Sequence, residues 1–396
     1  MKFNSLKRVR VFIALALVVL LSSAASSQTK LAIRAGHIVL ADGSVQVGGW
    51  LLTDASKIAG VVAASSKAPE GYHEVDRSSS YLVPGFVDLS SRAGAPHDLV
   101  EDAESNDEMA LAVDSLSPSH RDFEMLPAGG VTAVVLLPVD SNVVGGRGAL
   151  VHTGKNTDRV LAGATPLALS FKKAAWSSDK QPPTSFAGAH DLLRSAFAAA
   201  RNPKSRVASP LAMAARGELP VVFRVSTDRE IAAALSLASS SGLEVALMGV
   251  EGIDESLDLI GGAKVRVALS VPKLSGGRRA AKLPAMIQEK GVGLALFAGS
   301  PKSSPEALRI GAVLAVREGL TAKAALAAIT SVPASMAGCE GTVGSLKKGC
   351  QADFLVFSGP PLDLSSAHSE TWIAGKRVFT RTRVVVPTAK EEEAAK

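Results

Sequence analysis

Strand-like and helix-like segments alternate regularly through the second half of the chain. Strict alternation of this kind implies right-handed βαβ units and a parallel sheet. The strand-like segments cover residues 219–225, 243–250, 265–271 and 292–297, and the helix-like segments cover residues 228–240, 254–260, 279–289, 306–317 and 322–328. Together with earlier apolar runs, they give about seven candidate strands, a number that fits either a barrel or a doubly wound open sheet.

Shorter apolar segments, broken by turn residues, lie on both sides of this alternation. Residues 31–62 contain several short strand-like runs separated by Asp-Gly and Gly-Gly pairs, and residues 344–379 return to the same pattern. This punctuation is typical of small β-sheets. We therefore expect β structure at both ends of the chain.

The first 27 residues have the composition of a secretory signal peptide. Four basic residues precede an apolar run at residues 11–21, and small residues follow at 22–27, which predicts cleavage after Ala25 or Ser27. An uncleaved anchor is the alternative. We expect a chain exported to the periplasm or outside the cell, with no membrane span in the mature part and a tail at residues 387–396.

Composition narrows the choice of partners. The 396 residues are 47% hydrophobic and 20% charged, typical of a globular protein. Residues 1–27 hold four of the 43 basic residues and none of the 37 acidic ones, so the net charge of +6 falls to +2 without them. No basic stripe is interleaved with aromatic residues, so we do not expect nucleic acid as a partner.

Residues 81–92 form a hinge between the first β region and the alternating part. Pro84-Gly85 makes a turn, and the strand that follows directs Asp88, Ser90 and Arg92 to one face near its exit. An acidic segment at residues 98–108 comes next; it either binds a cation or is a solvated loop.

Several motifs resemble the metal-dependent amidohydrolase superfamily, and most nearly its imidazolonepropionase-like branch. The hinge resembles the superfamily's first barrel strand, residues 129–132 resemble the entry to the second strand, and residues 344–353 resemble the carboxyl-terminal signature. The resemblance implies a TIM-type (β/α)8 barrel at residues 83–335. It also implies a β-sandwich, formed by residues 28–82 and 336–386.

In that superfamily, histidines and an aspartate at the barrel mouth bind a divalent metal, such as zinc, that activates water. A guanidinium has only donors and cannot ligate a metal. The five matching positions here hold Ser90, Arg92, Arg224, Gly249 and Gly299. We therefore predict a chain without a metal cofactor that has lost hydrolysis.

A pocket with two arginines suits carboxylate or phosphate groups. We expect Arg92, Arg224, Ser90 and Ser226 to bind an anionic small molecule. Two other functions stay open. One is a hydrolase of cyclic amides or other non-peptide carbon–nitrogen bonds, with displaced ligands from His97, His120, His152 and the acidic loop. The other is a structural or partner-binding subunit, as a homo-oligomer or with an active paralogue.

Cys339 and Cys350 are the only cysteines. In an oxidising compartment they could form a disulfide, or remain two separate buried thiols. The sequence leaves both possibilities open.

Overall fold

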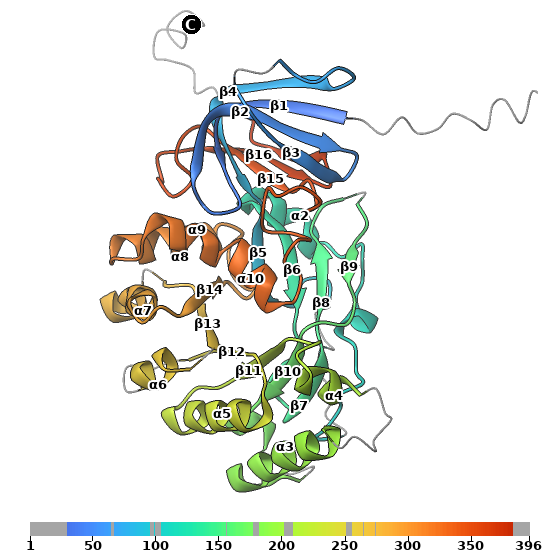
Figure 1. Ribbon diagram of the computed structural model, residues 1–396, viewed down its shortest axis with the longest axis vertical. Helices are drawn as coiled ribbons and strands as arrows, with labels where there is room; N and C mark the ends of the chain where they lie inside the picture. The colour runs from blue at the N-terminus through green and yellow to red at the C-terminus, as the bar shows by residue number, and fades with distance from the viewer. Residues whose placement is uncertain are drawn as a thin grey trace, which may run out of the picture.

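A computed structural model describes residues 30–64, 67–95, 99, 104–155, 157–176, 182–201, 209–250, 256–263, 265–273 and 275–382. The expected signal peptide and tail lie outside these ranges. Figure 1 shows a β-sheet at one end of the molecule, built from both ends of the sequence, and a part with parallel strands and helices below it. Within the described ranges, no helix is both long and apolar enough to cross a membrane.

The sheet at that end has seven strands in the order β17-β16-β15-β4-β1-β2-β3. Its strands are β1 (Lys30–Val39), β2 (Val45–Asp54), β3 (Lys57–Ala63), β4 (His73–Pro84), β15 (Phe354–Phe357), β16 (His368–Ile373) and β17 (Lys376–Thr380). β4 joins the two sequence regions, because it runs parallel to β1 and antiparallel to β15, with Leu82 opposite Val356.

This arrangement does not confirm the expected two-layer sandwich. A sandwich would place its strands in two separately hydrogen-bonded sheets that face each other. Here the β4–β15 ladder joins the amino-terminal and carboxyl-terminal strands edge to edge in a single sheet.

The predicted alternation of strands and helices is present. The parallel strands are β5 (Phe86–Ser91), β6 (Val131–Leu136), β10 (Leu167–Ser170), β11 (Val221–Arg224), β12 (Val245–Met248), β13 (Val265–Ser270) and β14 (Gly293–Phe297). The helices are α2 (Asp122–Met125), α3 (Phe186–Ala200), α4 (Pro210–Ala215), α5 (Asp228–Ser241), α6 (Leu257–Gly261), α7 (Gly277–Glu289), α8 (Ala307–Arg317), α9 (Ala322–Ala328) and α10 (Ser331–Met336), with 3-10 turns η1 (Ala112–Ser115), η2 (Leu126–Gly129) and η3 (Lys173–Ala175).

Local sequence explains where these helices begin. At α5, the Thr227 hydroxyl accepts a hydrogen bond from the Glu230 amide at 3.3 Å, and the Glu230 carboxylate accepts one from the Thr227 amide at 3.3 Å. This reciprocal capping satisfies two donors that the first turn of a helix leaves unpaired. Gly242, in the left-handed region at φ 69°, ends the helix.

The described strands do not close into a barrel. They form two sheets, β14-β13-β12-β11-β10-β7 and β5-β6-β8-β9. Where a barrel would pair β6 with β10, the edge of β6 is occupied by the antiparallel β8 (Ala149–His152) and the edge of β10 by the antiparallel β7 (Val144–Arg147). β8 also pairs with β9 (Val160–Ala162). The doubly wound alternative does not fit either, because β10 to β14 follow one another in sequence order without a reversal.

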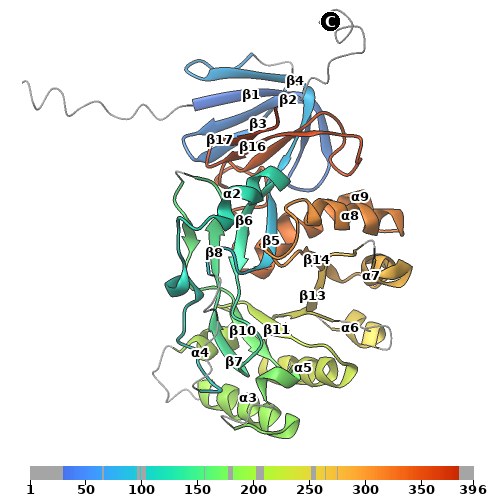
Figure 2. The same ribbon diagram turned by 180° about the vertical axis from the view of Figure 1, so that it is seen from behind.

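The two sheets share an apolar interior lined by small side chains. Val87, Ala133, Ala246 and Ala268 belong to this interior cluster. Met336 and other residues of α10 and the segment after it fill the same space, and Figure 1 shows α10 lying beside β5. Figure 2 shows helices α5, α6, α7 and α8 along the outer side of the parallel strands.

Candidate ligand site at the carboxyl ends of the parallel strands

The candidate site lies where parallel strands end together. Because parallel strands share one direction, the residues that follow β5, β6, β10 and β11 come to the same edge. Arg92, Asp140 and Lys172 follow β5, β6 and β10, and Arg224 is the last residue of β11.

Asp88 serves as a structural link between the two sheets. Its carboxylate accepts hydrogen bonds from the Ala298 amide at 3.0 Å, the Ser300 amide at 2.9 Å and the Ser300 hydroxyl. Burial raises the pKa of Asp88, while the hydrogen bonds from Ser300 and Ala298 act in the opposite direction. Nearby, the Arg92 amide donates to the Ser300 carbonyl at 2.8 Å. The carboxylate thus holds the end of β14 against β5.

Arg224 is half-buried at the end of β11. Its Nη2 donates to the Pro138 carbonyl at 3.1 Å, whereas its buried Nε has no hydrogen-bond partner. Burial lowers the pKa of Arg224, and the charge of Asp140 acts against this shift. A buried donor without an acceptor costs about 1–3 kcal/mol, so this guanidinium can accommodate an anionic group.

Asp140 and Lys172 stand next to Arg224 and form an ion pair, with 2.8 Å between Lys172 Nζ and Asp140 Oδ2. Burial acts to raise the pKa of Asp140, but the hydrogen bond from Lys172 and the charge of Arg224 outweigh it, so the pKa is lowered. With one carboxylate and two cations, this group carries a net positive charge.

Arg92 follows β5 and is half-buried. Its Nε is also buried and has no hydrogen-bond partner. Arg92 and Arg224 are held by different neighbours: the first by Ser300, the second by Pro138. The structure therefore places both arginines at strand ends but does not join them in one contact.

The two predicted serines are half-buried and held through their backbone. The Ser90 amide lies 3.4 Å from Asp88 Oδ1, and the Ser226 amide donates to Glu230 Oε2 at 2.6 Å. These hydrogen bonds use the backbone amides of the two serines, so their side-chain hydroxyls can bind a ligand.

Gly249 and Gly299 both adopt the left-handed region, with φ of 81° and 75°. Side chains other than glycine seldom adopt this conformation. A Cβ at Gly299 would meet no heavy atom within 4 Å. The backbone rather than crowding thus disfavours a metal-binding side chain at this position.

Comparison with known proteins agrees with this fold. The family model described as "Amidohydrolase family" matches residues 299–379. Amidohydrolase tasK of Hapsidospora irregularis is 23% identical over 376 residues, an alignment that covers 80% of this chain but only 38% of that protein. An amidohydrolase structure from Thermotoga maritima MSB8, also 23% identical, superimposes with a TM-score of 0.73 over 89% of this chain and 100% of its own.

The chain is therefore similar in sequence and in fold to proteins of the amidohydrolase superfamily. More distant structures share the fold. A zinc-bound adenosine deaminase from Xanthomonas campestris is 17% identical with a TM-score of 0.53, covering 93% of this chain and 97% of that one. Phenylurea hydrolase B is 14% identical with a TM-score of 0.58, covering 88% and 97%.

The residues that the sequence resemblance assigns to the metal positions do not fit a divalent cation. Two are guanidinium cations, two are glycines without a donor side chain, and Ser90 alone offers a neutral oxygen. In the part of the chain that the structure describes, no three His, Cys, Asp or Glu side chains gather as a metal site would require.

Of the histidines proposed as displaced ligands, the two that the structure describes, His120 and His152, do not gather in a metal site. His152 is 1% exposed, with Nε2 3.0 Å from Asp353 Oδ2 and Nδ1 3.1 Å from the Asp158 carbonyl. It pairs with Ala133, near the start of β6 and away from the site. His120 lies 3.0 Å from Asp122, and His97 is outside the described residues.

The acidic segment is described only in part, since residues 98 and 100–103 are not covered. Glu108 accepts a hydrogen bond from the Leu211 amide at 2.9 Å. That bond anchors the start of α4, so this carboxylate has a structural role.

Cys339 and Cys350 are buried free thiols. They lie in different apolar clusters, the interior cluster and the core of the seven-stranded sheet. The possible disulfide is therefore not formed. Burial raises the pKa of Cys339 to about 11, so its thiol stays protonated.

Sequence reasoning missed the carboxylate of Asp140. Its position directly after the apolar run at residues 131–138 was the signal, because active-site residues commonly follow the carboxyl ends of such strands.

Proposed function

We propose that this amidohydrolase-like protein has lost metal-dependent hydrolysis and binds an anionic small molecule at the carboxyl ends of its parallel strands. The observation that supports the proposal is the half-buried Arg224 guanidinium with its unpartnered Nε, at a residue that the sequence resemblance assigns to a metal-ligand position. A carboxylate or phosphate supplies the acceptors that this group lacks.

Neighbouring residues favour the same ligand. Lys172 adds a second cation, and Asp140 offsets only one of the two charges. Arg92, Ser90 and Ser226 would contribute further donors from the adjacent strand ends. A divalent cation would meet repulsion from this set, whereas an anion would be attracted.

The proposed protein is exported, on the composition of residues 1–27. It works in the periplasm or outside the cell with a small-molecule partner, as a homo-oligomer or with an active paralogue. Export is tested by sequencing the amino terminus of the secreted protein, which should begin after Ala25 or Ser27.

Ligand binding is tested by thermal shift and calorimetry on the mature chain, with succinate and inorganic phosphate as probes. We expect Arg224→Ala to weaken binding of the preferred anion at least about tenfold, because a charge-assisted hydrogen bond is lost. Arg147→Ala is the matched control, since Arg147 is also half-buried with an unpartnered Nε but lies on β7, opposite Leu167 at the start of β10. Equal binding by wild type, Arg224→Ala and Arg92→Ala would contradict the proposal.

The competing function is a hydrolase with a displaced metal. Similar folds include a prolidase, phenylurea hydrolase B and a zinc-bound adenosine deaminase. Mass spectrometry of the protein, after loading with zinc, manganese and iron and then dialysis, separates the two. Substoichiometric metal agrees with the anion-binding protein; about one tightly held metal per chain would favour the hydrolase.

A further inference from the structure

A second cavity lies at the opposite ends of the same strands, about 400 Å³ in volume. It opens where β11, β12 and β13 begin, whereas Arg224 stands where β11 ends. Its lining includes Glu244, Arg266, Val265, Val292, Met336 and Pro220. The cavity is therefore separate from the ligand site described above.

Strand register explains why two charged side chains reach this cavity. Arg266 of β13 pairs with Ala246 of β12, and paired residues direct their side chains to the same face. Ala246 and Ala268 belong to the interior cluster, so Arg266 also faces the interior. Glu244, two residues before Ala246, shares that face.

Small neighbours make room for the Arg266 side chain. On its other side Arg266 pairs with Gly293 of β14, where an added Cβ would lie 3.4 Å from Arg266 Cγ. The long Arg266 side chain thus lies between Ala246 of β12 and Gly293 of β14. Barrel interiors are ordinarily filled by bulky branched side chains at such positions.

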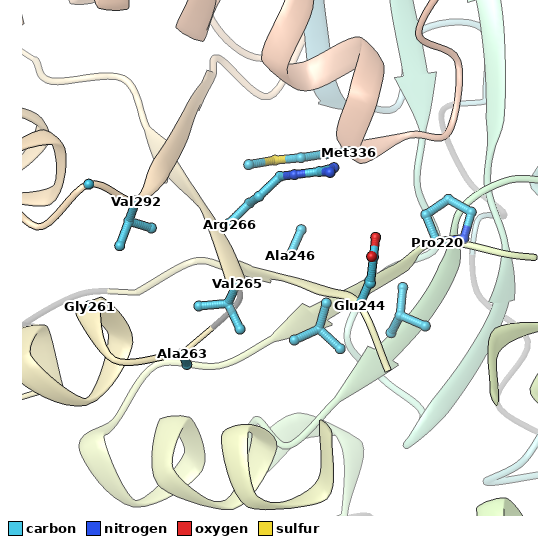
Figure 3. Close-up of a pocket in the computed structure, with 12 residues that line it drawn as sticks. Pro220, Glu244, Ala246, Gly261, Ala263, Val265, Arg266, Val292 and Met336 are labelled. Carbon is cyan, nitrogen blue, oxygen red and sulfur yellow. The ribbon is translucent and has the colours of Figure 1, made fainter. Parts of the chain in front are cut away.

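The walls of the cavity combine opposite charges with an apolar surface. Figure 3 shows Arg266 running alongside Met336, with Glu244 projecting into the same space from the neighbouring strand. Arg266 is half-buried and Glu244 is exposed at the rim. Neither side chain forms an ion pair or hydrogen bond with the other, or with another residue of the described ranges.

We propose that this cavity binds a small zwitterion, such as a free amino acid with an apolar side chain. The ligand carboxylate pairs with Arg266, its ammonium pairs with Glu244, and its apolar part packs on Met336, Ala246 and Pro220. Residues placed diagonally on neighbouring strands are roughly 7–8 Å apart, so two long side chains can hold the two ends of one such molecule.

The test is calorimetric titration of the mature protein with L-leucine. We expect millimolar or tighter binding that Arg266→Ala and Glu244→Gln each weaken about tenfold, since each removes one charge-assisted contact. N-acetyl-leucine and leucinamide, which lack the ammonium and the carboxylate respectively, should bind correspondingly weakly. Gly293→Val keeps both charges but narrows the cavity, and it should also reduce binding.

Two controls separate this cavity from other sites. Glu218→Gln removes an exposed carboxylate that pairs with Arg216 and should leave leucine affinity unchanged, as should Arg224→Ala. Leucine binding that survives Arg266→Ala, Glu244→Gln and Gly293→Val would overturn the proposal. So would loss of binding in Arg224→Ala alone, or absence of binding in the wild type at about 10 mM.

Discussion

The buried pair of His152 and Asp353 gives the sharpest prediction about stability. His152 lies on β8, in the part with parallel strands, and Asp353 precedes β15 of the seven-stranded sheet. Both side chains are 1% exposed, and 3.0 Å separates Nε2 from Oδ2. The pair therefore fastens the two parts of the molecule together, and we choose His152→Ala as the perturbation.

The expected cost follows from what the substitution leaves behind. Asp353 Oδ1 keeps its hydrogen bond from the Ala374 amide at 2.8 Å, but Oδ2 loses its ring partner inside the protein. Leaving a buried carboxylate oxygen without its hydrogen-bond partner costs about 3 kcal/mol. In a chain of this size that corresponds to a fall in Tm of roughly 4 °C.

Differential scanning calorimetry of the mature protein measures this fall. His120→Ala is the matched control, because His120 also lies 3.0 Å from a carboxylate but is 29% exposed, and exposed pairs contribute about 0–1 kcal/mol. An equal, small change in Tm for both variants would refute the reasoning. A double-mutant cycle with Asp353→Asn then isolates the coupling between the two side chains.

Three further predictions concern pH and two substitutions. Burial lowers the pKa of His368 from 6.5 to about 4. Its contribution of about 3 kcal/mol to the free energy of unfolding is therefore present above pH 6.5 and is lost as the pH falls towards 4. Urea unfolding should show this loss in the wild type and not in His368→Gln, and parallel pH curves of the two proteins would contradict the prediction. Gly299→Asp should destabilise by about 1 kcal/mol because of its positive φ and should not raise zinc content by mass spectrometry; one zinc per chain would count against the anion-site proposal. Asp88→Ala should lower the free energy of unfolding by about 3 kcal/mol, because it leaves the Ser300 and Ala298 amides without an acceptor; a urea midpoint equal to that of the wild type would show that these bonds contribute nothing.

Local sequence patterns predicted the elements well where each element depends on its own residues. The alternation from β11 to α9 appears within a few residues of the expected bounds, because buried strands and capped helices are encoded in short windows. Barrel closure was not predictable in this way. Closure depends on which strands pair with the free edges of β6 and β10. In this structure β8 pairs with β6 and β7 pairs with β10.

The candidate site shows the same limit. Strand-end positions predicted that Arg92 and Arg224 would lie at one edge of the sheets, since motif spacing alone fixes them. The contacts that surround them are long-range: Lys172 pairs with Asp140, and His152 meets a carboxylate 201 residues away. A short stretch of sequence does not reveal such distant partners. His152 was therefore a reasonable candidate ligand from the sequence, although its ring is hydrogen-bonded to Asp353.

The pairing of β4 with β15 has a consequence for how the chain assembles. β4 is complete once residue 84 has been synthesised, yet its partner spans residues 354–357. Until those residues emerge, one edge of β4 offers unpaired backbone groups that can template the wrong strand. Contacts so distant in sequence also form slowly. A chain that stops before residue 354 would keep this edge open, so we expect truncated chains to aggregate more readily than the complete one.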